Sequence, residues 1–303
     1  MRAAGVTAAS SRIHLPFHPM QFVITGAAGM LGQDLVAAAK GAGHEVVALP
    51  RADLDISDQA AVEQALGAAR ADVVVNCAAW TNVDGAETSP DAAMAVNGTA
   101  AGNLARAAAA SGAWTIHVSS DYVFDGTKRS PYLESDEVGP VSSYGRSKLE
   151  GEQAVAAQAP DRYTIVRSSW LFGAGGPCFP ATILRLAAER DELNVVDDQV
   201  GCPTFTGHLA SALVALASGG SPPLGIVHVA GGGECSWYEF AREIVAVSGV
   251  SCEVRPCITA EMPRPATRPA YSVLRSERDA PILPDWHRGL AEYMALTSAV
   301  SSK

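Results

Sequence analysis

The sequence predicts an α/β protein built on a doubly wound parallel sheet. Short apolar runs rich in Val and Ile alternate along the chain with amphipathic stretches of helical length. The runs are almost continuously apolar, as strands are when helices cover both faces of their sheet. The first run, at 21–25, leads at once into a glycine-rich turn and then into a helical pattern. Together these features are typical of a parallel sheet with crossover helices.

The first half of the chain follows this alternation closely. Apolar and β-branched runs predict strands at 21–25, 45–49, 71–79, 114–120 and 162–169. Apolar spacing and a high alanine content predict helices at 31–40, 58–69, 90–111 and from Tyr144 onward. Each strand is therefore followed by a helix, as the crossovers of a parallel sheet require.

The glycine-rich turn has the spacing of a dinucleotide-binding loop. In TGAAGMLG (25–32) the first glycine permits the tight turn, the second lets the backbone approach a pyrophosphate, and the third lets the helix pack on the strand. The helix N-terminus then faces the phosphates with its partial positive charge. The sequence thus predicts a Rossmann fold, with the cofactor held by a set of five residues. They are Gly26, Gly29, Met30, Leu31 and Gly32.

The second cofactor contact is expected after the strand at 45–49. Arg51 follows it where a carboxylate would select a free ribose 2′-hydroxyl, so NADPH is favoured and NADH is the alternative. A solvated loop arginine is the other interpretation of Arg51. The small residues Ala78 and Ala79, after the strand at 71–79, would let the backbone lie beside the cofactor.

The second half of the chain is less regular. Helices are expected at 180–190, 206–218, 237–247 and near 285–298, a strand at 225–230, and long functional loops at 125–142 and 259–284. We expect a dinucleotide-binding domain over 20–168 plus about 204–248. A smaller C-terminal substrate-binding domain is expected over about 169–203 plus 249–303, and residues 1–19 are expected to be a disordered extension.

Composition excludes several classes of protein. The net charge of −10, from 22 basic and 32 acidic residues, argues against a partner that is nucleic acid or anionic membrane. No apolar run approaches the ~20 residues of a membrane span. The six cysteines are scattered, with no zinc-like spacing, and are expected to be reduced thiols in a cytoplasmic protein.

The candidate chemical site combines a tyrosine, a lysine and a serine. Tyr144 and Lys148 are four residues apart, which places them on one face of a helix. An ammonium beside the phenol is expected to lower the pKa of Tyr144 and make it a usable acid. Ser120 ends the strand at 114–120, where doubly wound sheets bind ligands. A glycine fingerprint, a serine at a strand end and YxxxK, in that order, are the constellation of short-chain dehydrogenases/reductases.

Longer segments resemble one family of this superfamily, the dTDP-4-dehydrorhamnose reductases. The resemblance lies in 76–87, 117–152, 169–173, 197–204 and 263–274. It implies NAD(P)H-dependent reduction of the 4-keto group of dTDP-4-dehydro-β-L-rhamnose to dTDP-L-rhamnose. It makes Tyr144 the proton donor, Lys148 a ligand of the nicotinamide ribose and Ser120 a hydrogen-bond donor to the carbonyl. It also implies that Thr81, Tyr122 and Trp170 line the sugar pocket and that Asp55 and Ile56 lie near the adenine.

The chain departs from the family in its substrate half. Cys178 and Tyr271 stand where relatives often have asparagine, which leaves the sugar and its stereochemistry open. Asp34 matches an acidic residue that holds Mg²⁺ in some relatives, but Gly207 stands where a second carboxylate is needed, so no metal is predicted.

A diphosphate brings negative charge into an acidic protein and needs arginine. Five arginines at 255–278 are candidates, and Arg268 is the best of them, whereas Trp237 and Tyr238 are expected in the core. The five are Arg255, Arg264, Arg268, Arg275 and Arg278.

Other functions remain open at this stage. A related ketoreductase or a 4-epimerase acting on another nucleotide deoxysugar would share the motifs, and so would a non-catalytic NADP-binding regulatory subunit. A dehydratase is disfavoured, because Tyr122 follows Asp121 where that class has a glutamate. The oligomeric state is not decided by any motif, and a homodimer is one possibility.

Overall fold

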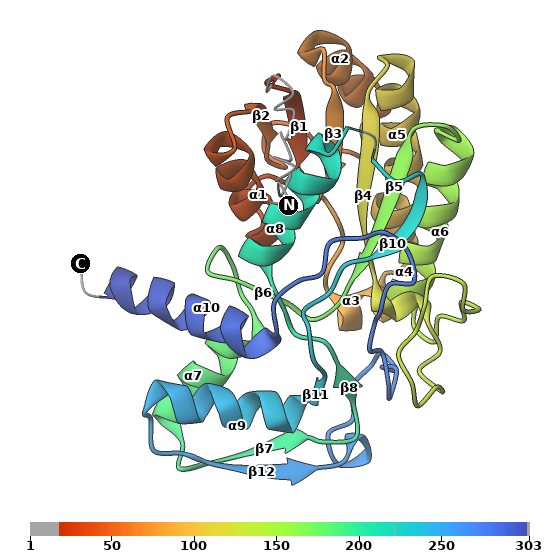
Figure 1. Cartoon of the computed structure of the whole chain (residues 1–303). Coiled ribbons are helices and arrows are strands. Elements are labelled where there is room, and N and C mark those ends of the chain that lie inside the picture. Colours follow the sequence, from red (N-terminus) through yellow and green to blue (C-terminus); the bar gives the residue numbers. More distant parts are fainter. Residues whose placement is uncertain (1–17, 221, 302–303) are drawn as a thin grey trace, which may run out of the picture.

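A six-stranded parallel sheet is the centre of the molecule. The computed structural model describes residues 18–220 and 222–301, so most of the expected extension at 1–19 lies outside them. The strand order is β10-β5-β4-β3-β1-β2, and every neighbouring pair is parallel (Figure 1). The strands are β1 (Gln21–Thr25), β2 (Glu45–Leu49), β3 (Val73–Asn76), β4 (Trp114–Ser120), β5 (Tyr163–Ser168) and β10 (Gly225–His228). This order confirms the doubly wound Rossmann architecture.

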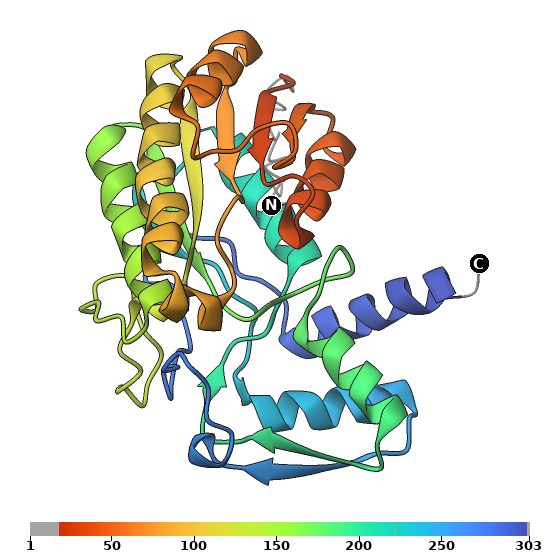
Figure 2. The same cartoon turned by 180° about the vertical axis from the view of Figure 1, so that it is seen from behind.

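Helices cover both faces of the sheet, and alternate strand residues separate the two layers. Phe22 and Ile24 of β1 pack with α1 (Met30–Gly41) and α8 (Thr206–Ser218). Val23, between them, faces the opposite side and packs with α2 (Gln59–Ala69) and α5 (Ala101–Ala110). Helix α6 (Ser143–Gln158) lies beside α5 on that second face (Figure 2). Burial on both faces explains why the strands read as continuous apolar runs.

The alanine-rich helix expected at 90–111 contains a π-helical segment. It runs as α4 (Pro90–Met94), η1 (Ala95–Ala100) and α5, and the short α3 (Val83–Thr88) precedes it. Glycine lets α6 approach closely here, since a Cβ on Gly151 would lie 2.1 Å from the carbonyl oxygen of Asn97. A π-bulge of this kind is frequent near functional sites.

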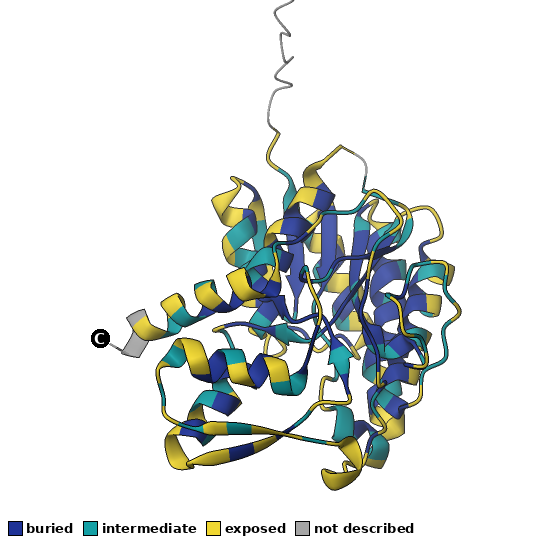
Figure 3. Cartoon of the chain, turned by 60° about the horizontal axis from the view of Figure 1, so that its bottom comes forward, coloured by how far each residue is buried: buried dark blue, intermediate teal, exposed yellow. Residues whose placement is uncertain are grey.

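A smaller unit with its own core lies at the carboxyl ends of the main strands. Strands β7 (Glu192–Val196) and β12 (Glu253–Cys257) pair in parallel. They share a hydrophobic core with α7 (Phe179–Glu189), α9 (Trp237–Ser248) and α10 (Trp286–Ser301), whose inner faces are buried in Figure 3. We expected the residues of α9 to belong with the main sheet, but Phe240 and Ile244 pack in this second core.

Short paired strands connect the two units. They are β6 (Leu171–Phe172), which pairs with β9 (Thr204–Phe205), and β8 (Val200–Gly201), which pairs with β11 (Cys235–Ser236). Two 3-10 turns, η2 (Asp121–Val123) and η3 (Thr259–Glu261), complete the described elements.

All six cysteines are free. Over residues 18–220 and 222–301, no helix is long and apolar enough to cross a membrane.

A buried ion pair joins α6 to the sheet. Glu152 and Arg167 are 3% and 2% exposed, and the guanidinium donates from Nε (2.8 Å) and Nη2 (2.6 Å) to the two carboxylate oxygens. The Ser119 hydroxyl donates to the same carboxylate at 2.6 Å. Because Ser119 is on β4 and Arg167 is on β5, one side chain of α6 is bound to both central strands.

We predict that Arg167→Met lowers the free energy of unfolding by about 3–5 kcal/mol, because Glu152 is left buried without its partner. The matched control is Arg106→Met, which breaks a pair with Glu63 whose side chains are 42% and 49% exposed. That control should cost less than about 1 kcal/mol. Urea denaturation measures both, and equal losses in the two variants would contradict the prediction.

Candidate active site

The glycine turn lies where the strand order reverses, between β1 and β3. Gly26 has φ +65°, and a Cβ on it would lie 2.6 Å from the backbone nitrogen of Ala78. A Cβ on Gly32 would lie 2.3 Å from the carbonyl oxygen of Gly26. These contacts allow only glycine, and they bring the β1–α1 turn against the backbone after β3, with the N-terminus of α1 beginning at Met30. Backbone amides that no side chain covers, at a helix N-terminus, suit the binding of a pyrophosphate.

The segment after β3 is held rigidly beside this turn. The Asn76 side chain accepts hydrogen bonds from the Thr25 hydroxyl (2.8 Å) and the Ala78 amide (3.1 Å). Asn97, in the π-helical segment, accepts from the Trp80 amide at 2.8 Å and donates to the Trp80 carbonyl at 3.1 Å. The backbone of Ala78 and Ala79 is thus fixed from both ends.

The expected adenine end lies after β2. Ile56 is buried, and Asp55 is exposed and bound to Ser57. Arg51 pairs with Asp55 at 3.6 Å, and its side chain is 86% exposed. Its guanidinium therefore lies mostly in solvent, which is also what the interpretation of Arg51 as a solvated loop arginine expects.

Tyr144, Lys148 and Ser120 are brought together at the carboxyl end of β4. Ser142 caps α6 by accepting from the Gly145 amide at 3.1 Å, so the helix begins just before Tyr144. Glu87 of α3 accepts from the amide and hydroxyl of Ser143, which adds a negative charge at this helix N-terminus. The Lys148 Nζ donates to the Val118 carbonyl at 2.7 Å.

The pKa values at this site differ from the expectation. Burial, with a smaller contribution from the nearby carboxyl of Asp121, raises the pKa of Tyr144 to about 12, and a hydrogen bond with Ser120 opposes the shift. Burial lowers the pKa of Lys148 to about 8, against the attraction of Glu152. The expectation of a lowered pKa for Tyr144 is therefore wrong for this structure, because burial dominates and no effect of Lys148 offsets it.

Two of the residues expected around the sugar, Tyr122 and Trp170, belong to aromatic pairs. Tyr122 meets Tyr144 edge to face, with centroids 5.4 Å apart. Trp170 has the unusual φ of +46° and stacks on Trp237, with centroids 3.4 Å apart. Its indole lies against Gly201, where a Cβ would approach to 2.4 Å. Thr81 is exposed at the end of the segment after β3.

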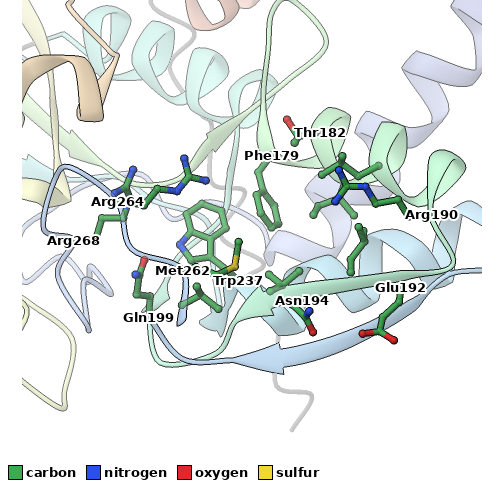
Figure 4. A pocket seen from close by; sticks show the side chains of 15 residues that line it. Phe179, Thr182, Arg190, Glu192, Asn194, Gln199, Trp237, Met262, Arg264 and Arg268 are labelled. Atoms are coloured by element: carbon green, nitrogen blue, oxygen red, sulfur yellow. The ribbon is translucent and has the colours of Figure 1, made fainter. Parts of the chain in front are cut away.

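A cavity of about 480 Å³ lies in the smaller unit, lined in part by Trp237, the indole on which Trp170 stacks. It lies between α7, β7 and the 262–268 segment, and Trp237 lines it besides packing on the second core (Figure 4). Arg264 and Arg268 lie at one end of the cavity and Arg190 at the other. The cavity thus joins apolar and indole surfaces to three guanidinium groups.

Only two of the five arginines expected near a diphosphate line this cavity. Arg255 instead pairs with Glu192 and Glu253 on the outside of β12, and Arg278 donates to backbone carbonyls. Arg190 was missed by the sequence analysis, because it follows a helix far from the arginine-rich segment in sequence.

Asp84 of α3 holds the arginine-rich segment in place. Its carboxylate accepts from Arg268 (3.1 Å) and from the Ala266 amide (3.2 Å), and it pairs with Arg264 at 3.4 Å. Burial raises the pKa of Asp84, but the hydrogen bonds from Arg268 and Ala266 outweigh it and leave the pKa below its ordinary value. This carboxylate, which the sequence analysis did not single out, connects the main unit to the cavity.

The residues at which the chain departs from the family are not among those that line this cavity. Cys178 is buried against Tyr293, and the Tyr271 hydroxyl donates to Glu234 at 3.0 Å. Asp34 accepts a short hydrogen bond from Thr206. Within residues 18–220 and 222–301, no group of three or more His, Cys, Asp or Glu side chains could hold a metal ion.

Comparison with known proteins identifies the family. Residues 20–298 match the family model described as RmlD substrate binding domain. A dTDP-4-dehydrorhamnose reductase of Mycolicibacterium smegmatis is 47% identical over 291 residues, covering 94% of this chain and 88% of that protein. The chain therefore belongs to the RmlD family, that of the dTDP-4-dehydrorhamnose reductases. A dTDP-4-keto-6-deoxy-D-glucose reductase of Streptomyces niveus is 42% identical, covering 93% of this chain and 99% of that protein.

The solved structures of the RmlD family agree with the fold. The dTDP-4-dehydrorhamnose reductase of Bacillus anthracis, solved in complex with NADP, superposes with a TM-score of 0.88 at 34% identity. The match covers 92% of this chain and 99% of that one.

We predict that Gly32→Ala weakens binding of NADPH at least tenfold, because its Cβ would push the turn away from α1. The matched control is Gly41→Ala at the other end of α1, where a Cβ meets nothing within 4 Å. Fluorescence titration with NADPH measures both variants. An unchanged Kd for Gly32→Ala would show that the turn does not bind the cofactor.

Proposed function

We propose that this chain is an NADPH-dependent reductase of the 4-keto group of a dTDP-4-keto-6-deoxysugar, with dTDP-4-dehydro-β-L-rhamnose as substrate and dTDP-L-rhamnose as product. The observation that carries the proposal is the position of Tyr144, Lys148 and Ser120. They gather at the carboxyl end of β4, on the sheet edge that also holds the glycine turn. A hydride donor bound at that turn and a proton donor on α6 would meet at this edge.

The chain's own residues supply the acid and the oxyanion contact. Reduced nicotinamide, when bound, supplies the hydride. We assign the pyrophosphate to the turn at Gly26, Gly29 and Gly32, and the ribose to Lys148. Tyr144, whose pKa of about 12 keeps it protonated at neutral pH, gives its proton to the sugar oxygen as the carbonyl carbon is reduced. Ser120 donates a hydrogen bond to the same oxygen.

The cavity suits the nucleotide part of such a substrate. Stacked indoles offer a surface for a pyrimidine ring, and guanidinium groups bind a diphosphate through paired donors. We assign the sugar to the wall formed by Thr81, Tyr122 and Trp170, and the diphosphate to Arg268 beside it. Arg268 is close enough to Tyr122 to lower its pKa, against the larger effect of burial. The sugar and the diphosphate would therefore lie side by side.

The other candidate functions are less well supported. Tyr122 occupies the position that a dehydratase fills with a glutamate. A regulatory subunit would not need a proton donor, whereas this chain has Tyr144 and the Ser142 cap that begins its helix. We place the reaction in the cytoplasm, an assignment supported by the six free thiols.

Tyr144→Phe should lower kcat by about 10²–10⁴, because the general acid is lost, while the Kd for NADPH stays within about twofold. The matched control is Tyr163→Phe at the opposite end of the neighbouring strand, which should keep full activity. NADPH oxidation with dTDP-4-keto-6-deoxysugars, with product configuration read by NMR, measures the reaction. Full activity in Tyr144→Phe would refute its assignment as the acid.

Asp84→Asn should raise the KM for the sugar nucleotide about tenfold and leave kcat within about threefold. The reason is that a charge-assisted hydrogen bond holding Arg268 is weakened. Asp91→Asn on the neighbouring α4 is the control, because that side chain is exposed. Steady-state kinetics separate the two constants. A variant that loses kcat at an unchanged KM would show that Asp84 acts on the chemistry instead.

A further inference from the structure

Asp121 is a buried carboxylic acid that the proposed mechanism does not use. It follows Ser120 directly and is 1% exposed. Its Oδ1 accepts a hydrogen bond from the Ser120 hydroxyl at 2.8 Å, and its Oδ2 makes no hydrogen bond in the part of the chain that the structure describes, although the Ser272 hydroxyl lies near the carboxyl group. Buried polar atoms without a partner are rare, so this one calls for a reason.

The groups that face Asp121 do not neutralise a negative charge. They are Tyr144 from α6, Tyr122 from its own turn, Cys202 from the segment between β8 and β9, and Ser272 from the segment after Tyr271. None of the four is a cation. Burial raises the pKa of Asp121 to about 6, although the hydroxyls of Ser272 and Ser120 stabilise its charged form. The acid is therefore close to half protonated at mildly acidic pH.

The direction of the hydrogen bond from Ser120 depends on this acid. A serine hydroxyl has a single hydrogen. With Asp121 ionised, that hydrogen is donated to Asp121, while the Ser120 oxygen accepts from the Tyr122 amide at 3.2 Å and lies within hydrogen-bond reach of Tyr144. Ser120 then has no hydrogen left for a substrate oxygen. If Asp121 carries a proton, it can donate to Ser120 and free the serine hydrogen for the substrate.

We propose that Asp121 is a positioning residue whose protonated form turns the Ser120 hydroxyl toward the reacting carbonyl oxygen. The ionised form would hold the hydroxyl away from that oxygen, so it is the less active form. This inference rests on the proposed reductase function, because it needs a carbonyl oxygen at Ser120.

The sign of the pH dependence follows from the same geometry. The protonated form of Asp121 is the more active one, so kcat/KM of the free enzyme falls as pH rises through about 6, by up to about tenfold between pH 5 and pH 7. Deprotonation of Lys148 comes higher, near pH 8, and Tyr144 stays protonated throughout. Bound substrate and cofactor exclude water and raise the pKa of Asp121 further, so the corresponding fall in kcat lies at a higher pH than the fall in kcat/KM.

The test compares pH profiles of kcat/KM for the wild type and two variants. Asp121→Asn has a neutral amide that can donate to Ser120 permanently, so it should keep the activity seen at pH 5 and lose the tenfold fall toward pH 7. Ser120→Ala should be slower at every pH and should also lose the fall, because the acid acts through this hydroxyl. Asp125→Asn changes a half-buried carboxylate in the following loop, bound to Thr127 and Tyr132, and should keep the wild-type profile.

Two results would overturn the inference. One is a fall near pH 6 that persists in Asp121→Asn, and the other is a fall that persists in Ser120→Ala. Thermal melting and NADPH binding report whether Asp121→Asn folds. The result for Ser120→Ala stands even if Asp121→Asn does not fold. If the proposed function itself is wrong, the wild type does not oxidise NADPH with the keto-sugar nucleotide, and this outcome is distinct from both.

Discussion

The position of the chemical site depends on how α6 is bound to the sheet. Along one face of this helix, Tyr144, Lys148 and Glu152 follow one another at four-residue intervals. Glu152 is held by Arg167 of β5 and Ser119 of β4, and Lys148 by the Val118 carbonyl of β4. Because two of these three side chains are anchored to central strands, the helix cannot rotate or slide. Tyr144 is thereby placed beside Ser120 at the end of β4.

The short helix α3 connects this site to the smaller unit. Its Glu87 binds Ser143 at the start of α6, and its Asp84 binds Arg268 and the Ala266 amide in the segment that lines the cavity. One six-residue helix therefore contacts both the catalytic helix and the proposed diphosphate site. The stacked Trp170 and Trp237 form the second connection, from the sugar wall to the cavity. The two regions to which we assign the sugar and the diphosphate are thus connected through α3 and the stacked indoles.

Burial is the main influence on the acids and bases of the site. It raises the pKa of Tyr144 and Asp121 and lowers that of Lys148, so all three shift toward their neutral forms. Lys148 does not offset the effect of burial on Tyr144, whose pKa therefore rises. A protonated tyrosine is the form that a ketone reduction needs, so the chemistry does not require a depressed pKa. In our proposal, the activity then depends on the direction of the hydrogen bond at Ser120.

Local pattern in the sequence was enough to predict the doubly wound sheet, the glycine turn and the shared helix face of Tyr144 and Lys148. These features depend on residues close together in the chain, where periodicity and backbone sterics act directly. Tertiary packing decided the rest. It placed α9 in the second core, brought Arg190 to the cavity and Asp84 to Arg268, and buried Asp121 beside Ser120. Such contacts join distant segments, and the pKa shifts follow from the burial they create, which no local spacing encodes.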